Sequence, residues 1–304
     1  MCLDGDYKEH GIRFLHGFAS DYALTDANFV VPVLDELKHV AVLLEPLSIA
    51  EKALYQAMKI QQRLKIWTPK RVLVLGAGAL GLLVTILLRS AGFDVSTVAR
   101  QAPESLKVKI VNSVGASYIN SVTNPLDSLD QKYDLIVEAT GNAQVAIQST
   151  RFLSANGVLC LLGVYSSRIF SYDMGDLLRE VVLGNKLVFG SVNANKRYFE
   201  LGLQHMSKVK EMFPDVLERM ITSRLPPDRI IADETLEQGM KSVRVKLPLS
   251  VLNSVRSMFV SSSYRWFTSN VSLLGRCRSI LLSFYPVVLR IRLASQTSEY
   301  KTNQ

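Results

Sequence analysis

Cysteine is scarce in this chain of 304 residues, which has Cys2, Cys160 and Cys277 and no C-x-x-C pair. This spacing excludes a disulfide framework and a zinc site made of cysteines alone, and it is typical of a reducing compartment. The N-terminus lacks the basic-then-apolar pattern of a secretory signal. No stretch reaches the roughly 18 apolar residues that a membrane-spanning helix needs. We therefore expect a cytoplasmic protein.

Acidic residues are nearly absent from the last part of the chain. Residues 246–304 hold eight Lys or Arg and one acid, so they carry +7 of the net charge of +8 and leave +1 for the first 245 residues. These 59 residues also contain twelve serines, one glycine and no Asp. A basic apolar tail can touch membranes or nucleic acid. We favour the alternative, a poorly ordered or unselected segment, and expect no nucleic-acid or membrane partner.

The first 245 residues have a different pattern, in which short apolar runs alternate with helical periodicity. The predicted strands are 72–75, 94–98, 116–120, 133–139, 158–162 and 187–190, and the predicted helices between them are 82–90, 107–114, 143–153 and 174–183. Further helices are predicted over 48–59, 198–220 and 234–242, and a last strand over 243–247. This alternation predicts an α/β fold with a doubly wound parallel sheet, whose ligand loops lie at the carboxyl ends of the strands.

A glycine motif follows the first of these strands. Gly76, Gly78 and Gly81 have the G-x-G-x-x-G spacing, between a buried strand and a helix. In a dinucleotide site the first glycine permits the tight turn, the second lets the backbone approach the pyrophosphate, and the third lets the helix pack on the strand. The N–H groups at the helix start would then face the phosphates. The alternative is a glycine-rich structural turn.

The next strand lacks the acid that usually binds the ribose of NAD. It ends Val98-Ala99-Arg100-Gln101, and the nearest acid is Glu104. Arg100 can instead pair with the 2′-phosphate of NADP. We therefore favour NADP, with NAD tolerated; the alternative is that Arg100 is a solvated surface residue.

Two further features bear on the site. The turns that follow later strands are predicted to face the same cofactor, and they are Thr140–Asn142, Leu162–Val164 and Ser191–Asn193. Ser48 is predicted to be the N-cap of the helix over 48–59, with Glu51 completing a capping box.

Several separate segments resemble one family. They are GDYKEHGI, LLEPLSIAEKAL, VLVLGAGALGLL, EATGN, LCLLGVYSS and GSVNANKRYFELGLQH, in family order over about residues 1–245. They are similar to the glucose 1-dehydrogenases of the medium-chain, zinc-dependent alcohol dehydrogenase superfamily, best known from archaea. The resemblance implies oxidation of D-glucose or a similar aldose at C1 to the lactone with NAD(P). In that reaction zinc acidifies and orients the hydroxyl, and hydride passes to the nicotinamide. It also implies a homo-oligomer, dimer or tetramer.

The resemblance assigns roles residue by residue. Glu45 matches a carboxylate at the catalytic zinc that can also contact sugar, and Glu9 matches an acid that hydrogen-bonds the sugar. Asn193 matches the asparagine between nicotinamide and substrate. Read without the family, Glu45 is a helix-entry carboxylate and Glu9 a solvated loop acid. The cofactor residues implied are Gly76, Ala77, Gly78, Ala79, Leu80, Gly81, Arg100, Thr140, Leu162, Gly163, Val164, Ser191, Val192 and Asn193.

The family pattern also predicts a division of the chain. Residues 1–50 are expected to be a remnant of a GroES-like catalytic domain, 51–195 the NAD(P)-binding Rossmann domain, 196–245 a return to the catalytic domain, and 246–304 an unrelated tail. We expect an N-terminal truncation that removes most zinc ligands and leaves Cys2 as the lone remainder of a structural zinc lobe. With Glu45 as one ligand in place of three, tight zinc binding is not expected here.

Overall fold

The structure, a computed structural model, describes residues 8–11, 14–18, 25–167, 169–224, 279–280 and 291–292. Residues Leu34–Arg224 form one compact unit, which contains the sheet described below. The described residues on either side of this unit belong to a second unit. The domain boundaries at 50/51 and 195/196 stay a prediction.

Only short elements of the second unit are described. Strands β1 (Glu9–His10) and β2 (Phe14–Leu15) pair in parallel, and β9 (Ser279–Ile280) pairs antiparallel with β10 (Ile291–Arg292). A 3-10 helix, η1, covers Ala27–Phe29. The helix and strand predicted over 234–247 lie outside the described residues, as does most of the predicted tail.

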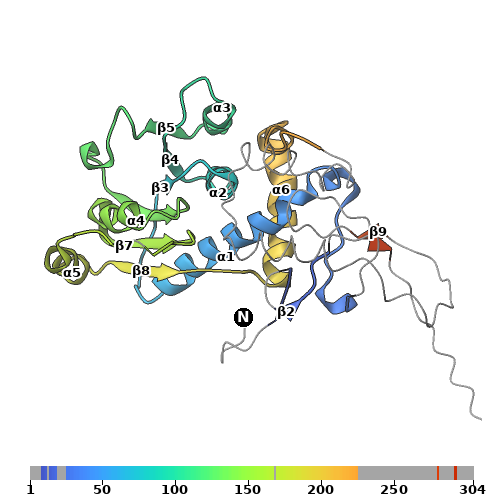
Figure 1. Cartoon of the computed structure of the whole chain (residues 1–304), viewed down its shortest axis with the longest axis horizontal. Coiled ribbons are helices and arrows are strands. Elements are labelled where there is room, and N and C mark those ends of the chain that lie inside the picture. The colour runs from blue at the N-terminus through green and yellow to red at the C-terminus, as the bar shows by residue number, and fades with distance from the viewer. Residues whose placement is uncertain are drawn as a thin grey trace, which may run out of the picture. The chain divides into compact units, whose positions relative to one another are not determined.

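The compact unit is built on a six-stranded parallel sheet (Figure 1). Its strands are β3 (Arg71–Leu75), β4 (Asp94–Ala99), β5 (Ser117–Asn120), β6 (Tyr133–Glu138), β7 (Leu153–Leu161) and β8 (Leu187–Gly190). The spatial order is β5-β4-β3-β6-β7-β8, and every neighbouring pair is parallel. This is the strand order of the Rossmann fold, so the predicted doubly wound sheet is confirmed. The order reverses between β3 and β6, where such sheets bind their ligands.

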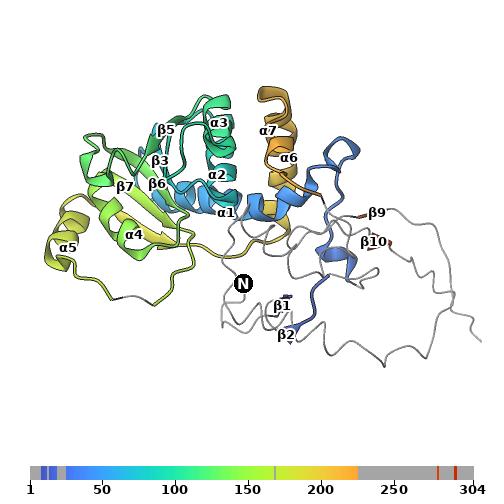
Figure 2. The same cartoon turned by 45° about the horizontal axis from the view of Figure 1, so that its top comes forward.

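Helices cover both faces of this sheet. Figure 2 shows α1, α2 and α3 on one face and α4 and α5 on the other. Helix α6 packs against α1 and α2, and the short α7 follows it. The bounds of these helices are α1 Leu44–Gln61, α2 Ala79–Ser90, α3 Leu106–Ser113, α4 Ala143–Ser149, α5 Met174–Leu183, α6 Lys196–Met212 and α7 Val216–Arg219; the 3-10 helices are η2 Asp35–Leu37, η3 Ala41–Leu43, η4 Leu126–Ser128 and η5 Thr150–Phe152.

The central strands are apolar along their length because both of their faces are covered. In β3 every residue after Arg71 is buried, and in β6 only Asp134 is partly exposed. One cluster of the core joins side chains of four strands with Phe152; it consists of Leu73, Leu75, Val98, Tyr133, Ile136, Phe152, Leu153 and Leu159. This packing fixes the sheet that carries the candidate site.

Helix α1 starts earlier than the capping pattern predicts. It begins at Leu44, so Ser48 lies inside it, and the Ser48 hydroxyl donates to the carbonyl of Glu45 at 2.6 Å. Pro46 falls in the first turn, where a helix needs no N–H donor, so it does not delay the helix start. Glu51 is buried and accepts no cap bond; its carboxylate lies 2.7 Å from His205 Nδ1 on α6. The predicted capping box is therefore wrong.

Two predicted helices are too long. The helix predicted over 143–153 ends at Ser149, and β7 begins at Leu153, with a shift of register against β6 between Tyr133 and Leu135. The helix predicted over 198–220 is divided into α6 and α7. Pro214 follows the end of α6, and Asp215 has a left-handed backbone with φ of +62°.

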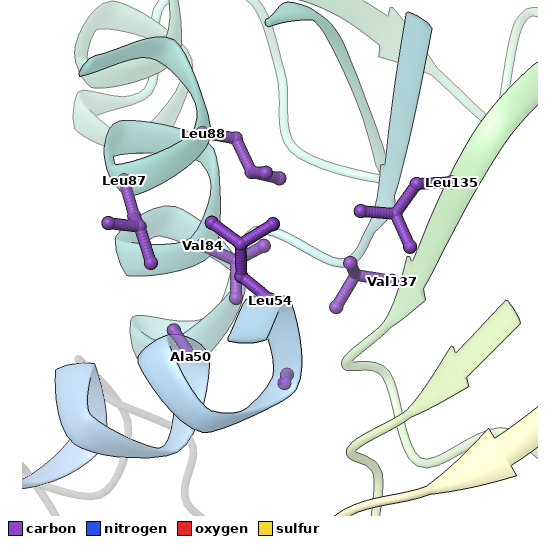
Figure 3. A pocket seen from close by; sticks show the side chains of 8 residues that line it. Ala50, Leu54, Val84, Leu87, Leu88, Leu135 and Val137 are labelled. Atoms are coloured by element: carbon purple, nitrogen blue, oxygen red, sulfur yellow. The ribbon is translucent and has the colours of Figure 1, made fainter. Parts of the chain in front are cut away.

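A small apolar cavity lies between α1, α2 and β6 (Figure 3). Its lining side chains are Ala50, Ala53, Leu54, Val84, Leu87, Leu88, Leu135 and Val137. No polar side chain lines it, so it offers nothing to orient a sugar or a phosphate. We therefore interpret it as a packing defect of the core and not as a functional site.

Asp134 ties the beginnings of three strands together. Its Oδ2 accepts from the backbone N–H of Lys70 at 2.9 Å and of Arg71 at 3.0 Å, and its Oδ1 accepts from the hydroxyl of Ser154 at 2.9 Å. Burial by itself would raise the pKa of Asp134, but these hydrogen bonds outweigh it and the pKa is lowered. The ionised form is therefore the one that the fold stabilises.

We expect Asp134→Asn to lower the free energy of unfolding by about 1 kcal/mol at pH 7. A carboxyl whose pKa is lowered by folding stabilises the protein above its ordinary pKa and loses this contribution as the pH falls through the folded value. The difference between wild type and variant should therefore shrink below about pH 4. Urea unfolding followed by circular dichroism between pH 3 and 7 measures it, with the exposed Asp130→Asn as control. A difference that is the same at all pH values would contradict this account.

Candidate functional site

Four loops lie side by side where parallel strands of the sheet reach their carboxyl ends. Leu75 is in register with Glu138, Glu138 with Leu161, and Leu161 with Gly190. The ladder continues one residue past the strands, because the N–H groups of Ala139, Leu162 and Ser191 donate to the carbonyls of Leu75, Glu138 and Leu161 at 2.9, 2.9 and 3.0 Å. The loops that begin at Gly76, Ala139, Leu162 and Ser191 therefore start in one row.

The three glycine positions of the first loop differ in whether the described protein itself requires glycine there. Gly76 has φ of +106°, a conformation that side chains rarely adopt. A Cβ on Gly81 would lie 1.9 Å from the carbonyl oxygen of Gly76. Gly78 is exposed and extended, and apart from its two chain neighbours no described residue has an atom within 4 Å of where its Cβ would be. Nothing in the described protein therefore requires glycine at position 78, whereas an approaching ligand would.

The start of helix α2 is open to an anion. Gly78 is its N-cap and supplies no side-chain bond, and the first turn contains no acidic residue. Ala77 is buried, and Ala79 and Leu80 are half-buried in the first turn. The first N–H groups of a helix have no partner within the helix, and the helix dipole favours negative charge there. The loop from Gly76 to Gly81 therefore has the geometry of a phosphate-binding turn.

A buried carboxyl side chain, that of Glu138, joins the second and third loops, and no sequence motif predicts this role. Glu138 is 0% exposed at the end of β6. Its Oε1 accepts from the N–H of Thr140 at 2.6 Å and from the Thr140 hydroxyl, and its Oε2 accepts from the hydroxyl of Tyr165 at 2.5 Å. Burial, followed by the bond to Glu138, raises the pKa of Tyr165, so this hydroxyl stays protonated and donates. The only sequence signal for this link is an acid at the end of an apolar strand.

Glycines permit the close packing of these two loops. A Cβ on Gly163 would lie 2.6 Å from Glu138 Oε2 and 2.6 Å from Cα of Gly141. A Cβ on Gly141, whose φ is +68°, would lie 2.9 Å from the carbonyl oxygen of Val164. The methyl group of Thr140 in turn lies near Gly76, 3.1 Å from where a Cβ would be. The first three loops therefore form one interlocked surface.

Arg100 lies at one end of the row. It is exposed and directly follows β4, the neighbour of β3. The bend beyond it is held by β5, because the carbonyl of Gln101 accepts from the Tyr118 hydroxyl at 2.7 Å and from Asn120 Nδ2 at 3.3 Å. Arg100 is thus accessible at the position where a dinucleotide places its adenosine ribose.

The predicted nicotinamide-side residues lie at the other end. Leu162 is buried, Val164 is 82% exposed, and Val192 is 49% exposed. The hydroxyl of Ser191 is buried and has no hydrogen-bond partner among the described residues. Asn193 has a left-handed backbone with φ of +60°, so the chain turns sharply at the residue that the family resemblance assigns to nicotinamide and substrate.

The structure says less about the residues predicted to bind the substrate and the metal, Glu45 and Glu9. Glu45 is half-buried in the first turn of α1. Glu9 belongs to β1 in the second unit, and its side chain lies outside what is described. Among the described residues, no three His, Cys, Asp or Glu side chains are grouped so that they could hold a metal ion. The described residues therefore do not supply a zinc site around Glu45.

The strand order and the glycine loop are those of the Rossmann fold. Comparison with known proteins identifies the family to which the chain belongs. A family model described as "Glucose dehydrogenase C-terminus" matches residues 38–249. Glucose 1-dehydrogenase 1 of Caldivirga maquilingensis is 46% identical over 252 residues, which cover 83% of this chain and 71% of that relative. Glucose 1-dehydrogenase of Thermoproteus tenax is 40% identical over 228 residues, covering 75% of this chain and 65% of that relative.

A solved structure agrees with these relatives. Glucose dehydrogenase of Haloferax mediterranei, in complex with NADP, Zn and gluconolactone, is 33% identical, with a TM-score of 0.67; the match covers 73% of this chain and 62% of that chain. The chain therefore belongs to the glucose 1-dehydrogenase family of zinc-dependent medium-chain dehydrogenases, which confirms the resemblance seen in the sequence. It spans 65–71% of the lengths of the two glucose 1-dehydrogenases named above. Within the described part, no helix is long and apolar enough to cross a membrane.

Two substitutions separate the glycine needed for a ligand from the glycine needed for folding. Gly78→Val should change the free energy of unfolding by about 1 kcal/mol or less, because only the helix N-cap is altered, but it should abolish NADPH binding. Gly81→Ala should destabilise by about 3 kcal/mol, because the new Cβ would overlap Gly76. Urea unfolding and fluorescence titration with NADPH measure the two effects. Retained NADPH affinity in Gly78→Val would contradict a pyrophosphate at this loop.

Replacing the buried carboxylate should affect both folding and binding. Glu138→Gln keeps the size of the side chain but leaves one of its donors without an acceptor. We expect a loss of about 1–3 kcal/mol in the free energy of unfolding, together with weaker NADPH binding. The exposed Glu104→Gln serves as the control in the same urea and NADPH titrations. Equal behaviour of the two variants would show that Glu138 does not hold the loops.

Proposed function

We propose that this chain binds NADP across the carboxyl edge of its sheet, with the pyrophosphate over Gly78 and the start of α2. The observation that carries the proposal is that Gly78 is a glycine for which the described protein gives no internal reason. The neighbouring Gly76 and Gly81 each have such a reason. Space that is kept free beside uncapped helix N–H groups suits a phosphate.

The row of loops gives the cofactor a direction. In this proposal the 2′-phosphate pairs with Arg100 beside β4, and the nicotinamide lies by Leu162–Val164 and Ser191–Asn193, beyond β7 and β8. Thr140 lies between these ends, next to Gly76. The Ser191 hydroxyl at this end is buried and has no hydrogen-bond partner among the described residues. The relative from Haloferax mediterranei, solved with NADP, supports this choice of cofactor.

We further propose that the reaction is the oxidation of D-glucose, or a similar aldose, at C1 to the lactone. The C1 hydrogen leaves with its electron pair as hydride and reduces NADP⁺ to NADPH, the C1–O bond becomes the lactone carbonyl, and the hydroxyl proton is released to water. In this proposal Asn193 stands between the two reactants and Glu45 contacts the sugar. For Glu9, which belongs to the second unit, the sugar contact rests on the family resemblance alone. Support comes from relatives named glucose 1-dehydrogenase and from the solved complex that contains gluconolactone. Because the described residues do not make a zinc site, no step is assigned to a metal.

Arg100 gives a direct test of cofactor choice. Arg100→Glu should weaken NADP binding by about tenfold or more, because a charge-assisted pair becomes a repulsion. NAD, which lacks the 2′-phosphate, should be bound as well as before or better. Competition of each dinucleotide against bound NADPH gives the ratio, and replacement of the exposed Lys65 in Lys65→Glu controls for net charge. A ratio unchanged by Arg100→Glu would show that this arginine is only solvated.

The activity itself is tested by NADPH formation with the purified chain, D-glucose, NADP and added zinc. Turnover that depends on glucose supports the proposed reaction. NADPH binding without turnover, even with excess zinc, would instead support the alternative that the chain is a cofactor-binding part separated from its catalytic half. If adding the N-terminal catalytic domain of a relative then restored NADPH formation, the missing activity would be due only to the lack of the zinc ligands which that domain supplies.

A further inference from the structure

Lys52 lies outside the glycine loop and outside every residue assigned so far, yet it contacts the proposed nicotinamide side. Its Nζ donates to the carbonyl oxygen of Val192 at 2.6 Å, a contact between residues 140 positions apart in the chain. Lys52 is half-buried in the middle of α1, while Val192 belongs to the loop after β8. This contact therefore joins a helix to the end of the row of loops.

The carbonyl group that accepts from Lys52 lies directly before Asn193, at the point where the backbone turns away from the sheet. The sheet ladder ends at Ser191, whose N–H donates to Leu161 at 3.0 Å. The next carbonyl, that of Val192, belongs to the peptide unit that leads into Asn193, where the backbone becomes left-handed. A hydrogen bond to this oxygen therefore fixes the peptide plane from which Asn193 is displayed.

A second contact holds the same segment farther along. The guanidinium of Arg197 lies 4.3 Å above the ring of Tyr55, and the ring of Tyr198 meets Tyr55 edge-on at 5.9 Å. Tyr55 is three residues after Lys52, so it lies on the same face of α1. The segment that contains Asn193 is thus held to one face of α1 on both sides of that residue.

We propose that Lys52 is a positioning residue, which orients Asn193 toward the nicotinamide end of the cofactor by holding the Val192 carbonyl. This inference rests on the proposed function. Glu45 lies two helical turns before Lys52, on the same side of α1. The helix that carries the proposed sugar-binding carboxylate thereby also sets the loop that receives the nicotinamide.

The test compares two ligands that differ only in the nicotinamide end: NADPH and 2′-phospho-ADP-ribose. Lys52→Met removes the donor and keeps the length of the side chain. We expect it to weaken NADPH binding about fivefold to tenfold, as for loss of one charge-assisted hydrogen bond, and to leave 2′-phospho-ADP-ribose binding within about twofold. Lys52→Arg restores a donor and should recover most of the NADPH affinity. The matched control is Lys59→Met, an exposed lysine two turns farther along α1, which should change neither ligand.

The outcomes separate this inference from the proposed function. Equal loss of both ligands in Lys52→Met, or no loss of either, would overturn the positioning role while leaving NADP binding by the wild type intact. Failure of the wild type to bind either ligand would overturn the proposed function and the inference with it. Thermal unfolding of each variant shows whether the fold is retained. Should Lys52→Met unfold, Lys52→Leu gives the same comparison, because leucine also lacks a donor for the Val192 carbonyl.

Discussion

The candidate site depends on the register of four parallel strands. Because β3, β6, β7 and β8 end level with one another, their following loops begin in a single row at the reversal of strand order. The buried Glu138 then converts neighbouring loops into one surface, by accepting from Thr140 on its own loop and from Tyr165 on the next. A buried carboxyl group is stable only with hydrogen-bond partners, so the loops and Glu138 depend on each other.

Much of this arrangement is local and could be read from the sequence. Strands that are buried on both faces are recognised as short apolar runs. The spacing of Gly76, Gly78 and Gly81 predicts both the tight turn and the helix start with free N–H groups. The strand order follows because alternating strands and helices have few allowed topologies. The sequence also shows that no acid follows Ala99. In the structure Arg100 occupies that position and is exposed.

The predictions were wrong or lacking where contacts between residues far apart in the chain determine the structure. Ser48 looks like an N-cap, but packing of α1 against the sheet and α6 extends the helix back through Pro46 to Leu44, and Glu51 is paired with His205 instead. The partners of Glu138 and Lys52 are found only once the sheet has formed, since neither link has a motif. The side chain of Glu9 and most of the predicted tail, 246–304, lie outside the described residues, so these predictions stay untested.

The central claim is that the four loops of this chain bind NADP as one surface. Backbone hydrogen–deuterium exchange, with and without saturating NADP, measures this loop by loop. The account predicts slower exchange together in residues 76–82, 139–142, 162–165 and 191–193, with helix α5 unchanged. Unchanged exchange in the loop from Gly76 to Gly81, or slowing confined to regions away from the carboxyl edge of the sheet, would contradict it.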